Sequence, residues 1–247
     1  MMPPLVVIPA RLASTRLPGK PLADIAGRPM ILHVLDAARK ADIGPVVVAA
    51  AETEICDAVT SNGGTAVLTN PDLPSGSDRV WQALQTLDPQ GRYDTIINLQ
   101  GDLPTLEPSS LHSVLTVMSN PAFDIGTLVA PITSEDEKSA SSVVKVACHF
   151  EPQAEQTSAL YFSRQPIPWG DGAFWHHIGI YAWRRAALAR FVQLPPSGLE
   201  KRESLEQLRA LENGMRIGCA RIAIAPFGVD TPLDLERARR LLGAKRP

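Results

Sequence analysis

Residues 9–21, PARLASTRLPGKP, carry three cations and two hydroxyl side chains directly after a short apolar run. Arginine and lysine form charge-assisted hydrogen bonds with phosphate oxygens, and backbone N–H groups in such a loop bind them too. The segment is not a P-loop, because Gly-x4-Gly-Lys-Ser/Thr is absent and Pro21 follows Lys20. A solvated basic loop is the alternative interpretation. The position after a buried strand favours phosphate binding.

Two aspartates stand at places where a carboxylate is useful to phosphate chemistry. Asp102 closes the turn Gln100-Gly101-Asp102 after the apolar run 95–99, where it can hold Mg²⁺ beside a triphosphate. Taken alone, these residues are better explained by a plain turn, because Gly and Asp favour turns. Asp230 precedes the helix start Thr231-Pro232, and helix capping explains its neighbours better than it explains Asp230.

Three further segments have an ordinary structural explanation beside a functional one. Residues 75–79, SGSDR, either cap a helix or form a turn that binds base or ribose. The pair His176-His177 is not spaced for a metal site on a helix face, so hydrogen-bonded structural histidines are expected. Glu206 and Gln207 fit the solvated face of a helix. We find no nucleophile–base pair that indicates a covalent intermediate.

The elements that must position these residues alternate between strand and helix in the first half. Strands are expected at 5–8, 46–49, 65–68 and 95–99, with helices starting at Pro29, around 55–59 and over 75–87. This order predicts an α/β fold with a mostly parallel sheet and helices on both faces. Ligands bind beyond the carboxyl ends of such strands, where the loops after residues 8 and 99 both lie.

The second half is less regular. Strands are expected at 143–148, 178–183 and 217–225, with a helix around 205–211 and another beginning at Thr231. No Gly-, Ser- or Pro-rich linker divides the chain, so we expect a single domain over 1–247.

Composition narrows the class of protein. The 247 residues are 45% hydrophobic and 20% charged, which is typical of a folded globular chain. A net charge of −2 disfavours a nucleic-acid binder, and no apolar run is long enough to span a membrane. The N-terminus has no basic region typical of a secretory signal. Three widely spaced cysteines form neither a disulfide framework nor a zinc cluster, which favours the reducing cytoplasm.

Seven segments together resemble one known family, the 3-deoxy-manno-octulosonate cytidylyltransferases or CMP-KDO synthetases. In chain order they are PARLASTRLPGKPL, SGSDR, INLQGDLP, LYFSRQPIPW, HHIGIYAW, LEQLR and GVDTPLDLERAR. The resemblance implies a sugar-nucleotidyltransferase fold related to Rossmann folds, and a homodimer with residues of about 140–190 near the sugar pocket and subunit contact. It also implies a Mg²⁺-dependent reaction in which CTP and KDO give CMP-KDO and pyrophosphate for lipopolysaccharide assembly.

The same resemblance assigns roles by position. Arg11 and Lys20 are implied to hold the triphosphate, and Asp102 and Asp230 to bind Mg²⁺, these four forming the catalytic set. The residues implied around the nucleotide are Ala10, Arg11, Lys20, Ser75, Gly76 and Gln100. Those implied to line the KDO pocket are Arg164, His177, Tyr181, Glu206 and Gln207.

Three departures from the family pattern replace polar side chains by apolar ones, at Leu103, Leu73 and Ala50-Ala51. Two alternatives stay open beside a KDO enzyme. One is a cytidylyltransferase for another acid sugar, such as sialic acid or an amino analogue of KDO. The other is a nucleotide-binding regulator without catalysis.

Overall fold

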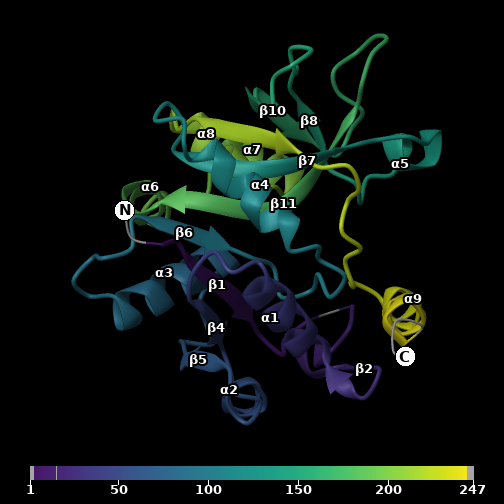
Figure 1. The fold of residues 1–247 in the computed structure, drawn as a ribbon. Coiled ribbons are helices and arrows are strands. Elements are labelled where there is room, and N and C mark those ends of the chain that lie inside the picture. The colour runs from purple at the N-terminus through teal and green to yellow at the C-terminus, as the bar shows by residue number, and fades with distance from the viewer. Residues whose placement is uncertain (1–2, 15, 244–247) are drawn as a thin grey trace. The chain divides into compact units, whose positions relative to one another are not determined.

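Strand β1 (Leu5–Ala10) lies between β4 (Val46–Ala50) and β6 (Thr95–Asn98) and runs parallel to both. Strand β5 (Thr65–Leu68) pairs in parallel with β4. The side chains of β1 from Leu5 to Ile8 are almost wholly buried, as expected for a parallel strand covered on both faces. These strands, which are drawn in Figure 1, belong to the first of two compact units, Met1–Leu111 with Pro226–Pro247, whereas His112–Ala225 forms the second.

The computed structural model describes residues 3–14 and 16–243. Thr15, the second hydroxyl of the basic loop, lies outside them. The expected single domain over 1–247 stays a prediction. No helix in the described part of the chain is long and apolar enough to cross a membrane.

Three helices connect the strands of the first unit. Helices α1 (Met30–Lys40) and α2 (Thr53–Thr60) link β1 to β4 and β4 to β5, so the chain moves outward in one direction. Helix α3 (Gly76–Leu87) then runs back from β5 to β6 on the far side of β1. Because such crossovers are right-handed, the change of direction places α3 on the opposite face from α1 and α2. The predicted parallel sheet with helices on both faces is confirmed.

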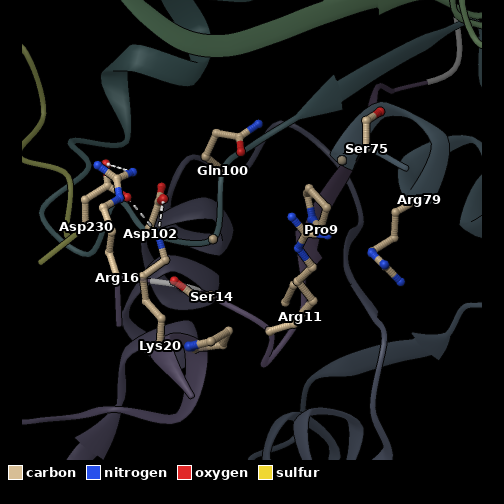
Figure 2. Close-up of a pocket in the computed structure, with 15 residues that line it drawn as sticks. Pro9, Arg11, Ser14, Arg16, Lys20, Ser75, Arg79, Gln100, Asp102 and Asp230 are labelled. Carbon is tan, nitrogen blue, oxygen red and sulfur yellow. Dashed lines mark hydrogen bonds and ion pairs between the residues drawn. The ribbon is translucent and has the colours of Figure 1, made fainter. Parts of the chain in front are cut away.

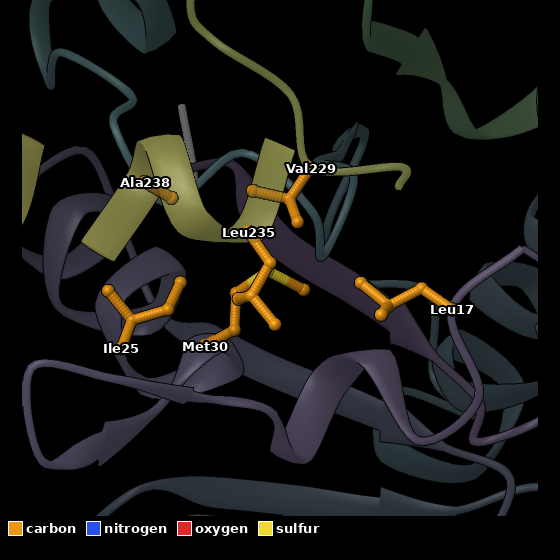
Figure 3. Packing of buried hydrophobic residues seen from close by; sticks show 6 residues of the cluster. All are labelled: Leu17, Ile25, Met30, Val229, Leu235 and Ala238. Atoms are coloured by element: carbon orange, nitrogen blue, oxygen red, sulfur yellow. The ribbon is translucent and has the colours of Figure 1, made fainter. Parts of the chain in front are cut away.

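The C-terminal segment of this unit packs beside the loop that follows β1. That loop contains the short helix η1 (Lys20–Leu22) and the hairpin β2 (Asp24–Ile25) and β3 (Arg28–Pro29). Helix α9 (Pro232–Gly243) begins as predicted: Thr231 Oγ1 accepts the N–H of Asp234, and Asp234 Oδ2 accepts the N–H of Thr231. Figure 3 shows the buried cluster that joins these segments, made of Leu17, Ile25, Met30, Val229, Leu235 and Ala238.

The second unit has a mixed sheet. Strand β7 (Ile125–Pro131) pairs antiparallel with β11 (Trp175–Arg184) and parallel with β12 (Ile217–Arg221). Strand β9 (Gln156–Ser158) borders β12, and β8 (Lys145–Ala147) pairs with both β11 and β10 (Tyr161–Ser163). The helices are α4 (Ser109–Val117), within which the chain enters this unit, α5 (Glu135–Ser139), α6 (Arg185–Phe191), α7 (Gly198–Glu203) and α8 (Gln207–Glu212).

Candidate active site

A cleft of about 780 Å³ opens at the carboxyl ends of β1 and β6. Its walls come from the loop after β1, the start of α3, the turn after β6 and the segment before α9 (Figure 2). The structure brings together every residue predicted to contact the nucleotide or the metal in this unit. They are Ala10, Arg11, Lys20, Ser75, Gly76, Gln100, Asp102 and Asp230.

An ion cluster occupies one side of the cleft. The Nζ atom of Lys20 lies 2.6 Å from Asp102 Oδ2 and 3.1 Å from Asp230 Oδ1. Arg16 adds a contact of 3.1 Å between its Nη2 and Asp230 Oδ2. Burial alone would lower the pKa of Lys20, but attraction to Asp102 and Asp230 outweighs it and holds that pKa above its usual value. The two carboxylates therefore lie close enough to share a single cation.

Backbone contacts and buried side chains hold this cluster in place. Gly19 has φ of 69°, a left-handed conformation that glycine adopts at little cost, and it turns the chain so that η1 starts at Lys20. Val229 is fully buried, and its N–H donates to Asp102 O at 2.9 Å. Val229 immediately precedes Asp230. This bond therefore holds the backbone at Asp230 against the backbone at Asp102, although the two residues are far apart in sequence.

The turn after β6 needs a glycine because it passes close to β1. A Cβ atom on Gly101 would lie 3.1 Å from Pro9 O and 3.3 Å from Ile31 Cδ1. Leu103, one of the three departures from the family pattern, lies in the same turn. Its side chain is apolar and 9% exposed, so this position supplies no metal ligand. Asp102 remains the acidic side chain that this turn contributes to the cleft.

The donor set fits a hard divalent cation. Two carboxylates converge, and the ammonium of Lys20 already stands between them as a cation. Within the described residues there is no group of three or more His, Cys, Asp or Glu side chains suited to a metal. Mg²⁺ is commonly held by one or two carboxylates, with substrate phosphates and water completing its shell. This pair matches that pattern.

The other side of the cleft in Figure 2 is formed by the start of α3. Ser75 caps the helix, since its Oγ accepts the N–H of Asp78 at 3.3 Å, so the structural explanation for Ser75 is confirmed. Arg79 is 2% exposed, and its guanidinium donates to Thr69 Oγ1 and Asn70 O. Burial lowers the pKa of Arg79, Glu52 opposes that shift, and Arg11 adds to it.

Three further residues hold or line this site without having been predicted as site residues. Arg16 is the remaining cation of the basic loop, and Arg79 belongs to the SGSDR segment, so both carried a signal in the sequence. Glu52 carried none. Its Oε2 accepts the N–H of Leu12 at 2.9 Å and so anchors the loop from the side of α2.

The residues predicted for the sugar pocket all lie in the second unit. Arg164 follows β10, and its guanidinium donates to three carbonyls: Glu203 O at 2.9 Å, Ser141 O at 2.9 Å and Ser204 O at 3.3 Å. The carboxylate of Glu203 is already used, because Oε2 accepts the Arg164 N–H and Oε1 accepts the Ser163 hydroxyl. Thus the partners of the Arg164 guanidinium are neutral, and its charge is available to an anion.

His177 and Tyr181 stand on β11 in ring contact, with centroids 5.5 Å apart. The Thr127 hydroxyl has one proton and reaches the carbonyls of Ile178 and Ile180, so its oxygen accepts a hydrogen bond from His177 Nε2 at 3.1 Å. Burial, with a smaller contribution from His176, lowers the pKa of His177 to about 3. His177 is therefore a neutral imidazole. Burial and the nearby Glu206 raise the pKa of Tyr181, which keeps its hydroxyl protonated.

Glu206 and Gln207 lie at the start of α8, directly after Ser204 and Leu205. Gln207 is 7% exposed, and its Nε2 has no hydrogen-bond partner within the described residues. Glu206 is partly buried and lies 3.8 Å from Arg209 Nη2. The expectation of a solvated face is wrong for Gln207. The spacing of the leucines predicts which side of the helix is apolar, but not which adjacent polar side chain is covered by the rest of the fold.

Known proteins are similar to this chain over almost its whole length. Residues 5–217 match the family described as Cytidylyltransferase. The chain is 59% identical over 239 residues to the 3-deoxy-manno-octulosonate cytidylyltransferase of Rhodospirillum centenum, a match covering 97% of this chain and 93% of that protein. Identity to the protein of the same name from Paramagnetospirillum magneticum is 57% over 241 residues, covering 98% of each.

Two solved structures are also similar. One is the structure of CMP:2-keto-3-deoxy-manno-octonic acid synthetase complexed with CTP, with a TM-score of 0.90, 40% identity, and coverage of 99% of this chain and 100% of that one. The other is a cytidylyltransferase from Leptospira borgpetersenii, with a TM-score of 0.64 and 15% identity, covering 100% of this chain and 89% of that one. At that identity the second likeness concerns the fold alone.

Proposed function

The chain belongs to the 3-deoxy-manno-octulosonate cytidylyltransferase family, and on that premise we propose that it transfers CMP from CTP to KDO and releases pyrophosphate. The observation that carries the proposal is the pairing of Asp102 and Asp230 around Lys20 in a cleft at the carboxyl ends of the strands. The high identity to proteins of that name favours KDO over other acid sugars, and the retained acid–lysine cluster favours an enzyme over a regulator.

The cleft supplies the charges that a nucleoside triphosphate needs. Arg11 and Lys20 hold the phosphates in this proposal, and Arg16 adds a third cation on the same loop. Ala10, Ser75, Gly76 and Gln100 surround the nucleoside. Cations that are already fixed by the fold stabilise charge on the leaving pyrophosphate without reorganisation, which is an effective source of catalysis.

Asp102 and Asp230 would hold Mg²⁺. The metal, when bound, neutralises phosphate charge and polarises the phosphorus centre. Because the Lys20 ammonium now contacts both carboxylates, we expect it to exchange these contacts for phosphate oxygens when metal and nucleotide bind. Lys20 thus serves the free protein as a counter-ion and the complex as a phosphate ligand.

The second unit supplies the sugar contacts in this proposal. The guanidinium of Arg164, whose partners are neutral carbonyls, suits the carboxylate of KDO. His177 and Tyr181 are uncharged at neutral pH, so they offer hydrogen bonds to sugar hydroxyls rather than charge. Glu206 and Gln207 complete the sugar contacts. Gln207 Nε2 has no hydrogen-bond partner among the described residues, so it can donate to an oxygen of the sugar.

The reaction is a single displacement at phosphorus. The 2-hydroxyl oxygen of KDO forms a bond to the α-phosphorus in line with the bond that breaks, and pyrophosphate departs with the electron pair of that bond. The hydroxyl proton passes to solvent. The chain contributes positioning and charge stabilisation and forms no covalent intermediate.

We also propose that the protein works as a homodimer in the cytoplasm and serves lipopolysaccharide assembly. CTP as a substrate and three cysteines that are free thiols support a reducing, nucleotide-rich compartment. Sedimentation of the purified chain tests the dimer, for which the protein should have twice the mass of one chain. A monomer at assay concentration would contradict it.

Pyrophosphate release tests the activity itself. We expect release only with CTP, KDO and Mg²⁺ together, and its loss in EDTA. Asp102→Asn should lose most of kcat, whereas Asp72→Asn, at an exposed position outside the cleft, should not. Faster turnover with sialic acid than with KDO would favour the other acid sugar, and CTP binding without turnover would favour the regulator.

A further inference from the structure

Lys145 is a lysine of β8 that is 0% exposed. Its Nζ donates to three backbone carbonyls, Ala140 O at 2.8 Å, Val143 O at 2.8 Å and Arg164 O at 2.7 Å. An ammonium group has three N–H donors, whereas a neutral amine has two, so three short contacts to acceptors require the charged form. The fold therefore buries a positive charge among neutral partners.

A buried charge of this kind is costly. Burial lowers the pKa of Lys145, and repulsion from the nearby Arg164 lowers it further. Lysine is almost never fully buried unless it is paired, and a hydrophobic side chain at this position would avoid the desolvation penalty. The presence of a lysine here therefore indicates a function of the ammonium group and its three hydrogen bonds that an apolar residue could not supply.

The three carbonyls define what Lys145 holds. Two belong to the loop 140–143 ahead of β8, and the third belongs to Arg164 itself, immediately after β10. The guanidinium of Arg164 in turn donates to Ser141 O in that same loop and to O of Glu203, the last residue of α7. Lys145 therefore donates hydrogen bonds to the backbone on both sides of the contact between Arg164 and Ser141. These bonds hold the loop and Arg164 in a fixed position relative to each other.

We propose that Lys145 is a positioning residue for acid-sugar recognition: it holds Arg164 and the loop 140–143 in the arrangement that receives the carboxylate of KDO. The proposal rests on the proposed function of the chain. It adds a residue outside the assigned pocket and a physical reason for its burial.

The first test replaces Lys145 by Met, which keeps the volume and removes the charge and all three donors. The KM for KDO should rise about tenfold or more, while the KM for CTP and kcat at saturating KDO stay within about twofold. Lys201→Met removes an exposed lysine of α7 and should change neither constant. An unchanged KM for KDO, or equal losses for both substrates, would overturn the proposal.

The second test asks whether Lys145 acts through Arg164. In the Arg164→Ala background, Lys145→Met should lower kcat/KM for KDO by less than about twofold, because the group that it positions is gone. A full, multiplicative loss in the double variant would mean that Lys145 has only a structural role. Circular dichroism and the melting temperature establish folding for every variant.

Lys145→Gln carries the same tests if Lys145→Met does not fold, because glutamine can still donate two hydrogen bonds. If neither variant folds, the residue is structural and the proposal fails. The wild-type protein separates this idea from the proposed function. Absence of CMP-KDO formation by the wild type refutes the proposed function, whereas an active wild type with unaffected Lys145 variants refutes the positioning role alone.

Discussion

Replacing Lys20 by Met tests the chemistry of the cleft at its most crowded point. The side chain of Lys20 is 16% exposed, and its Nζ makes two ion contacts, of 2.6 and 3.1 Å, with Asp102 and Asp230. A charge-assisted hydrogen bond to phosphate contributes about 1.5–3 kcal/mol, so its loss should reduce kcat/KM for CTP about 10- to 150-fold. Pyrophosphate release at limiting CTP and saturating KDO measures this ratio.

The same substitution should act in the opposite direction on metal binding. Without the ammonium, Asp102 and Asp230 lose their shared counter-ion, although Arg16 still contacts Asp230. Mg²⁺ added without nucleotide should therefore raise the melting temperature of Lys20→Met more than that of the wild type, because the metal no longer competes with an internal cation. Thermal unfolding with and without Mg²⁺ measures the difference.

Lys40→Met at the exposed end of α1 is the matched control and should behave as the wild type in both assays. If Lys20→Met left kcat/KM for CTP unchanged, Lys20 would not be a phosphate ligand. If Mg²⁺ shifted both melting temperatures equally, the carboxylate pair would not be the metal site.

Substitutions at other residues of the two units should each affect a different property of the protein. Asp102→Asn and Asp230→Asn should each fold, still bind CTP and lose most of kcat, and the double variant should lose much less than the product of the single losses; near-normal kcat in either would remove that residue from the catalytic set. Glu206→Ala and Gln207→Ala should raise the KM for KDO with CTP affinity unchanged, whereas effects within about 0.5 kcal/mol on both would favour a merely structural position. Below pH 6.5 the His177 side chain binds a proton in the unfolded chain but stays neutral in the folded one, because its pKa there is about 3. The free energy of unfolding should therefore fall between pH 6.5 and 3 by up to about 1.4 kcal/mol per pH unit. His177→Asn should flatten that slope in urea unfolding, and an identical slope would contradict the buried neutral imidazole.

Local patterns predicted much of the first unit. Runs of Val and Ile gave the parallel strands, and Thr231 with Asp234 predicted the start of α9 down to its two capping hydrogen bonds. The second unit was harder, because its strands are short and differently paired. Strand β12 ends at Arg221, four residues before the predicted end, and β7 was not predicted at all although it pairs with both β11 and β12.

The site divides in the same way. Cations after a strand and a carboxylate after its neighbour indicated a phosphate site, because parallel strands end at one edge. That Lys20 would stand between Asp102 and Asp230 depends on contacts between distant segments, such as the bond from Val229 to Asp102, which no local pattern shows. The burial of Arg79, Gln207 and Lys145 is likewise a tertiary property: charged and amide side chains predict exposure until the fold supplies their partners.

Phosphorus-31 NMR of the reaction mixture distinguishes transfer of CMP to KDO from hydrolysis of CTP. With the wild-type protein, CTP, KDO and Mg²⁺, we predict that the CTP resonances give way to one phosphodiester resonance of CMP-KDO and to pyrophosphate in equal amounts. Free CMP with pyrophosphate would mean hydrolysis rather than transfer to the sugar. Unchanged CTP in the presence of the folded protein would mean that the chain does not transfer CMP to KDO.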